Sequence, residues 1–124
     1  MAGENIPEVL SRWLSSLFPT SIIHSQEDRI EVYEVEDGYS IGYRMAYCVM
    51  TRCGFELSDC YKNLGQCIVY CIENGFAPTY ITVPEDHPHL VRLEKILSAI
   101  NLPIGLITIS PDGQVKVSVK PHVP

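Results

Sequence analysis

The chain of 124 residues has an ordinary globular composition, with 46% hydrophobic and 19% charged residues and a formal net charge of −6. This length is typical of one domain with a single core, predicted here over residues 1–124. No apolar run approaches the ~18 residues of a membrane span, and the first residues do not resemble a secretory signal. We therefore expect a cytoplasmic protein that has no membrane partner. The nine Lys and Arg residues are scattered, so the charge does not support autonomous nucleic-acid binding.

The first 50 residues predict one helix followed by three strands. Apolar residues recur at helical spacing over residues 6–18. The stretches 21–24 and 29–36 are rich in β-branched residues, and the second one alternates as a half-buried strand does. An Asp-Gly pair at 37–38 favours a hairpin turn. Residues 39–50 return as a strand whose end is apolar on both faces, as expected in the centre of a sheet.

The second half of the chain predicts helices and strands in alternation. Helical spacing is present over residues 59–74 and again from residue 90 to 100, and the second helix is predicted over 84–101, with Asp86 or His87 near its cap and Pro88 in its first turn. Residues 79–83 and 104–109 are typical of buried strands, and 115–119 alternates strictly, so we expect it to pair as a hairpin with one wet face. The predicted order is α-β-β-β-α-β-α-β-β. It indicates an α/β fold in which helices flank a mixed central sheet.

The helix at 59–74 has recognisable boundaries and one unusual interior residue. Ser58 can cap its first turn, and Gly75 stands at the position after its last turn, where a left-handed residue is common. Gly65 lies in mid-helix, where glycine costs ~1 kcal/mol relative to alanine. We therefore expect another part of the structure to approach the helix backbone closely at Gly65.

All five cysteines fall within 24 residues, which raises the question of a metal, a disulfide or a redox role. They are Cys48, Cys53, Cys60, Cys67 and Cys71. Their spacings do not form the short Cys-x(2–4)-Cys pairs of small zinc sites, and no Cys-x-x-Cys redox motif is present. A disulfide from Cys48 or Cys53 to a helix cysteine is geometrically easier than one within the helix.

Packing offers a simpler explanation for three of the cysteines. Cys60, Cys67 and Cys71 are seven and four residues apart, so they share one helix stripe with Leu64 and Ile68. A free cysteine packs like a small hydrophobic residue. The stripe is therefore expected to face the sheet, while a redox- or metal-responsive role remains an alternative.

Two further clusters could bind a metal ion, and each has a structural alternative. They are Glu85, Asp86, His87 and His89 near the second long helix, and Glu31, Glu34, Glu36 and Asp37 on the predicted hairpin. The first cluster also suits a helix N-terminus. The second suits a solvated hairpin end, because strand alternation places Glu31 on the face opposite Glu34 and Glu36.

The helix at 59–74 also contains Gln66 and Tyr70 in a Gln-x-x-x-Tyr arrangement, directly after the predicted central strand. Together with the order of elements, this arrangement resembles the restriction-endonuclease-like, or PD-(D/E)XK, nuclease superfamily. The core of that superfamily is αβββαβ. The resemblance extends over nearly the whole chain and is based on element order and one short motif. It implies a restriction-endonuclease-like core and a connection with DNA metabolism.

The chemistry of this superfamily requires an acidic residue on one strand and Glu-x-Lys on the next. The carboxylates hold Mg²⁺, and the lysine positions or polarises the attacking water. Aligning this chain on its Gln-x-x-x-Tyr helix places the first acid at or near Glu31. The Glu-x-Lys position then coincides with Cys48, Val49 and Met50, which supply neither a good Mg²⁺ ligand nor a cation.

The resemblance therefore leads to two hypotheses. In the first, the chain is a catalytically inactive domain without a cofactor, which acts as a structural, accessory or interaction protein. Its partner would be another protein or a second copy, bound through the Lys62, Gln66 and Tyr70 helix face or a sheet edge. In the second, the chain is a Mg²⁺-dependent endonuclease whose active-site residues have migrated. Glu31 and Glu56 would then be the metal ligands and Lys62 the cation, assisted by Gln66 and Tyr70.

Overall fold

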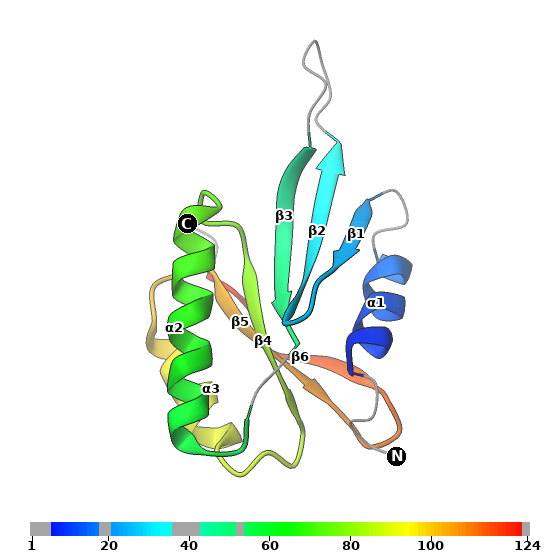
Figure 1. Cartoon of the computed structure of the whole chain (residues 1–124). Helices are drawn as coiled ribbons and strands as arrows, with labels where there is room; N and C mark the ends of the chain where they lie inside the picture. Colours follow the sequence, from blue (N-terminus) through cyan, green and yellow to red (C-terminus); the bar gives the residue numbers. More distant parts are fainter. Residues whose placement is uncertain (1–5, 18–20, 36–42, 52–53, 123–124) are drawn as a thin grey trace.

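The structure is a computed structural model that describes residues 6–17, 21–35, 43–51 and 54–122. Within these residues, three helices flank a sheet of six strands (Figure 1), and their order along the chain confirms the predicted order. The elements are α1 (Ile6–Leu17), β1 (Ile22–Ser25), β2 (Arg29–Val35), β3 (Tyr43–Met50), α2 (Leu57–Glu73), β4 (Thr79–Pro84), α3 (Leu90–Ala99), β5 (Ile104–Ile109) and β6 (Val115–Val119). The predicted turn at 37–38 lies outside the described residues.

The strands follow one another across the sheet in the order β1-β2-β3-β4-β5-β6. The pairs β1–β2, β2–β3 and β5–β6 are antiparallel, whereas β3–β4 and β4–β5 are parallel. Each parallel pair needs a crossover connection, and α2 and α3 provide these two crossovers. The sheet is therefore mixed, with its parallel part in the centre.

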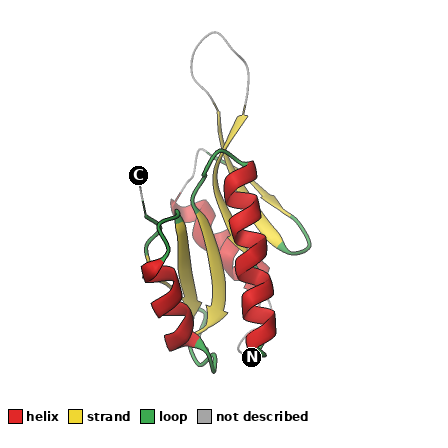
Figure 2. Cartoon of the chain, turned by 90° about the vertical axis from the view of Figure 1, so that its left-hand side faces the viewer, coloured by secondary structure: helices red, strands yellow, loops and turns green. Residues whose placement is uncertain are grey.

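Two hydrophobic cores lie on the two faces of the sheet. On one face, α2 and α3 pack on the central strands, and α2 contributes buried Cys60, Cys67 and Cys71. On the other face, α1 packs Leu10 and Leu14 against β2 and its neighbours. Figure 2 shows α2 and α3 in front of the sheet and α1 behind it. The predicted cysteine stripe is thus confirmed as core.

Strand alternation distributes β3 between these two cores. Cys48 and Met50 belong to the core beneath α2, and Val49, between them, belongs to the core beneath α1. All three side chains are at most 1% exposed. This is the arrangement expected of a central strand covered on both faces. None of the helices in the described segments has the length and apolar character that a bilayer span requires.

The boundaries of α2 differ at one end from the prediction. The helix begins at Leu57 with Glu56 as its N-cap, so Ser58 lies in the first turn and is not the cap. The Glu56 backbone N–H donates to Asp59 Oδ2 at 3.3 Å, which is one half of a capping box. At the other end, Gly75 has a φ of +67°, as predicted for the residue that follows the helix.

The helix predicted over 84–101 is shorter in the structure, where α3 covers Leu90–Ala99. Pro84 completes strand β4, which pairs it with Ile109 of β5. The backbone N–H of His87 then donates to the Pro84 carbonyl at 3.0 Å and closes a turn. The residues before 90, predicted as the start of the helix, therefore complete β4 and form a turn that precedes the helix.

Candidate functional site

A network of hydrogen bonds surrounds the carboxylate of Glu31 on β2. The Oε1 atom accepts from Gln26 Nε2 at 2.8 Å and from the Tyr33 hydroxyl at 3.1 Å. The Oε2 atom accepts from Arg29 Nε at 3.2 Å, and His24 Nδ1 lies 3.6 Å from Oε1. Glu31 is only 6% exposed. Both oxygens of a buried carboxylate are thus engaged within the chain.

Arg29 connects this network to helix α2. Its Nη1 atom donates to Asp28 Oδ1 at 3.1 Å and to the Tyr70 hydroxyl at 3.2 Å. Its guanidinium carbon also lies 4.7 Å from the centre of the Tyr70 ring, within the range of a cation–π contact. One arginine therefore joins the Glu31 carboxylate on β2 and the Asp28 carboxylate just before it to an aromatic residue on the helix.

The network changes the proton affinity of Glu31 and of the Cys48 thiol on the neighbouring strand. Burial raises the pKa of Glu31, but hydrogen bonds from Arg29 and Tyr33 and the charge of Arg29 outweigh it and hold the pKa below its ordinary value. In the β2–β3 register Glu31 pairs with Cys48. Burial, with the nearby charge of Glu31, raises the pKa of Cys48 to about 12. This thiol therefore stays protonated at neutral pH.

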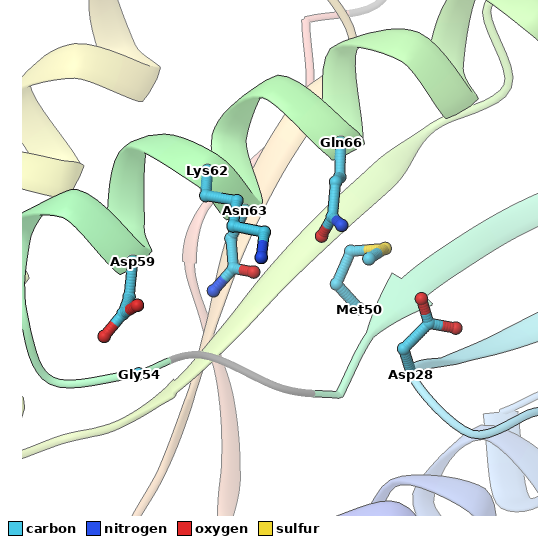
Figure 3. A pocket seen from close by; sticks show the side chains of 7 residues that line it. All are labelled: Asp28, Met50, Gly54, Asp59, Lys62, Asn63 and Gln66. Atoms are coloured by element: carbon cyan, nitrogen blue, oxygen red, sulfur yellow. The ribbon is translucent and has the colours of Figure 1, made fainter.

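A polar pocket of about 300 Å³ lies between the start of β2, the end of β3 and helix α2 (Figure 3). Met50 and Gly54 form part of its wall. Its polar lining comes from Asp28, Asp59, Lys62, Asn63 and Gln66. In Figure 3, Asp28 and Asp59 lie at opposite ends, with the lysine and the two amides between them. The pocket thus offers one cation, two carboxylates and two amides to a ligand.

The sequence predicted some of these residues and missed others. Lys62 and Gln66 line the pocket as neighbours on α2, whereas neither Glu31 nor Glu56 is part of the lining. Glu56 is exposed and begins α2. Tyr70 lies one helical turn beyond Gln66 and contacts Arg29 of the Glu31 network. The five predicted residues therefore belong to three neighbouring places. Lys62 and Gln66 line the pocket, Glu31 and Tyr70 belong to the Glu31 network, and Glu56 is the N-cap of α2.

Four lining residues were not predicted from the sequence, namely Gly54, Asn63 and the two acids Asp28 and Asp59. Asp59 precedes Lys62 and Gln66 by three and seven residues, so helical spacing could have placed it on the same face. Asp28 comes to the pocket only through the β2–β3 pairing, where its carbonyl accepts from the Thr51 backbone N–H at 3.0 Å. Among the residues that the structure describes, no group of three or more His, Cys, Asp or Glu side chains is placed to hold a metal ion.

His87 connects the loop before α2 to the turn before α3. It is 4% exposed, and its Nδ1 atom accepts from the His89 backbone N–H at 3.1 Å. The Nε2 atom must then carry the proton, which it donates to the Gly54 carbonyl at 2.9 Å. The Cys60 sulfur lies 3.8 Å from the same nitrogen. This histidine holds in place a loop that forms part of the pocket wall.

The cysteines in the described residues are all buried free thiols. They are Cys48, Cys60, Cys67 and Cys71. No disulfide joins these four, and the fifth candidate, Cys53, lies outside the described residues. Comparison with protein-family models, with curated proteins and with solved structures finds no match to this chain.

Proposed function

We propose that this chain is a nuclease-like domain without nuclease chemistry, which acts as a structural, accessory or interaction protein. The observation that carries the proposal is the saturation of Glu31 by Arg29, Gln26 and Tyr33. In the resemblance to PD-(D/E)XK nucleases, Glu31 stands where the first metal-binding acid is expected. Here the same carboxylate is used to hold the sheet and α2 together.

The Glu31 network does not fit a divalent cation. Mg²⁺ prefers several oxygen ligands in near-octahedral geometry. To reach Glu31 it would displace the Arg29 hydrogen bond and then lie beside the guanidinium. Two unit charges about 4 Å apart repel by about 4 kcal/mol in a partly solvated site, and a dication repels more strongly. The opposing residue, Cys48, offers only a buried protonated thiol.

The test is a cleavage assay on supercoiled plasmid and on a branched DNA, with Mg²⁺ and with Mn²⁺. We expect the wild-type protein to cleave no faster than the Lys62→Ala variant purified in the same way, which controls for contaminating nucleases. Metal-dependent cleavage that disappears in Lys62→Ala would overturn the proposal.

A second candidate function, a Mg²⁺-dependent nuclease with migrated residues, is favoured by one observation. The pocket places Lys62 and Gln66 together with the carboxylates of Asp28 and Asp59. Each of these acids has one oxygen bonded within the chain, to Arg29 and to the Glu56 backbone N–H respectively. The other oxygens are the candidate ligands; because the two acids lie at opposite ends of the pocket, an ion would bind at one of them and would activate a water molecule there.

The two candidates predict different results for matched variants. If the pocket is catalytic, Asp28→Asn and Lys62→Ala abolish cleavage, while Glu56→Gln, outside the lining, retains it. Equal cleavage by all three variants would eliminate the pocket as the active site. Glu31→Gln completes the set, because a nuclease that depends on Glu31 rather than on the pocket would be inactivated by this change alone.

A further inference from the structure

The outer face of α2 carries an exposed apolar stripe, whose first residue, Tyr61, accepts at its hydroxyl from Arg92 Nη1 of α3 at 3.4 Å. We call Tyr61, Gly65, Val69, Ile72 and Phe76 the α2 stripe; Phe76 follows two residues after the helix C-cap. The spacings of four, four and three residues keep the helical members, from Tyr61 to Ile72, within an arc of about 80° around the helix. Its four large side chains are between 46% and 52% exposed. The view in Figure 2 shows the outer side of the helix facing solvent.

Two residues of the stripe are unusual for their positions, although the Phe76 backbone N–H donates to the Cys71 carbonyl at 2.7 Å and closes the C-terminal turn of α2. A Cβ added at Gly65 would meet nothing within 4 Å, so no part of the described chain approaches the backbone there. Phe76 has a φ of +62°, a left-handed conformation that non-glycine residues rarely adopt. It nevertheless exposes a large aromatic ring. The sequence prediction of a close approach at Gly65 is therefore not met inside one chain.

We infer that the stripe binds a second copy of this chain, with the two α2 helices antiparallel across a twofold axis near Val69. In this arrangement Val69 faces its own counterpart. Ile72 of each copy lies over the partner's Gly65, where the missing side chain leaves room for it. Tyr61 of each copy packs beside the partner's Phe76. The same surface serves both copies, as a twofold interface requires.

Charge complementarity selects the second copy and the antiparallel orientation. Lys62 and Glu73 are eleven residues apart, so they lie about 20° apart on the same flank of the stripe. Neither residue has an ion pair in the part of the chain that the structure describes. A twofold axis perpendicular to the two helices reverses the direction of one helix relative to the other. It leaves the flanks that carry Lys62 and Glu73 on the same side of the interface in both copies. Each Lys62 then meets the partner's Glu73, whereas the twofold axis of a parallel pair runs along the helices and exchanges the flanks, so that Lys62 and the partner's Glu73 would lie on opposite sides of the interface and could not pair.

The length of α2 suits this arrangement. Its 17 residues span about 25 Å, and the stripe extends from the second turn of the helix to its C-terminal turn. The two stripes can therefore overlap from end to end with the helix axes 8–10 Å apart, roughly the usual distance between packed helices. This inference does not depend on the proposed function, because it uses only the outer face of α2.

The test is the oligomeric state of the full chain, measured by sedimentation across a concentration series. We expect a concentration-dependent dimer. Val69→Glu should raise its dissociation constant by at least ~100-fold, because two carboxylates then meet at the axis. Val91→Glu is the matched control, since Val91 is an exposed valine on α3, 68% exposed, outside the stripe. This variant should dimerise like the wild type.

A charge exchange tests the orientation. Lys62→Glu and Glu73→Lys should each weaken the dimer, and the two changes combined should restore it, because the pairs are re-formed with reversed sign. All four positions are exposed, so circular dichroism should show an unchanged fold. Three results would each overturn the inference. They are a monomer at every concentration, a dimer that Val69→Glu does not weaken, and a double variant that dimerises no more tightly than the single variants.

Discussion

Replacing Arg29 with methionine removes the guanidinium that binds Glu31 and leaves the rest of that network in place. Glu31 is nearly buried, and the Arg29 side chain is only 20% exposed. Breaking a buried pair from one side costs roughly 3–5 kcal/mol, because the remaining charge loses its partner. Glu31 keeps its bonds from Gln26 and Tyr33, so we expect Arg29→Met to lower the free energy of unfolding by about 2–3 kcal/mol.

A double-mutant cycle separates the pair from the loss of arginine packing. Glu31→Gln keeps the size of the side chain, removes the charge and should cost about 1 kcal/mol. The double variant Arg29→Met/Glu31→Gln should be more stable than the sum of the two changes predicts, with a coupling of about 1–2 kcal/mol. The assay is urea unfolding at pH 7, followed by circular dichroism.

The decrease of the free energy of unfolding at acid pH, the acid limb of the stability curve, measures the contribution of Glu31 independently. The pKa of Glu31 in the folded protein lies below its ordinary value of 4.5, so the unfolded chain takes up this proton first as the pH falls. The contribution of Glu31 is therefore complete above about pH 5 and is lost as the pH falls through the lowered folded-state pKa. Glu31→Gln should show a shallower loss of stability below pH 5 than the wild type.

Three results would refute this reasoning about Glu31. The first is a cost below 1 kcal/mol for Arg29→Met, and the second is an identical acid limb in the wild type and Glu31→Gln. The third is a gain of stability in Glu31→Gln, since a carboxylate retained for binding commonly lowers stability. That third result would also favour a functional role for Glu31 over the proposed structural one.

Other predictions concern single sites. Gly65→Ala should stabilise the monomer by about 1 kcal/mol in urea unfolding below the dimerisation range; a loss of stability would reveal a contact inside the chain. Gly105→Ala should cost roughly 1–3 kcal/mol in the same assay, because the new Cβ would lie 2.6 Å from the Val119 carbonyl oxygen; a neutral effect would contradict the tight β5–β6 packing. The buried thiols should react with a thiol reagent only after unfolding, as mapped by mass spectrometry; native reaction would favour the redox hypothesis. These thiols are Cys48, Cys60, Cys67 and Cys71.

The order of elements and the faces of α2 could be predicted because they depend on local periodicity. The stripe of Cys60, Cys67 and Cys71 repeats at helical spacing, and cysteine packs as a small apolar side chain. The apolar end of β3 likewise identified a strand covered on both faces. The start of α3 was wrong because Asp86, His87 and Pro88 in residues 84–89 are typical of a helix N-terminus, although the helical apolar spacing itself begins only at Leu90. Those residues instead complete β4 and form a turn, and pairing with β5 determines this.

The candidate site was less predictable because its partners are distant in sequence. Arg29, Glu31 and Tyr33 alternate along one strand, so their shared face could have been recognised. The bonds from Gln26 and Tyr70 depend on a turn and on helix docking, which periodicity does not specify. Asp28 reaches the pocket through strand pairing in the same way. The sequence could name the residues of α2, but not the residues that meet them.

Lys62 belongs to two surfaces, and this constrains how its variants are interpreted. It lines the pocket with Asp59 and Gln66, and it lies on the flank of the α2 stripe where the inferred dimer places the partner's Glu73. Lys62→Ala would therefore alter both the pocket and the dimer. Glu73 is outside the pocket lining, so Glu73→Gln should weaken the dimer and leave the pocket chemistry unchanged. A property lost in Lys62→Ala and kept in Glu73→Gln belongs to the pocket, whereas one lost in both variants depends on the pairing of the two chains.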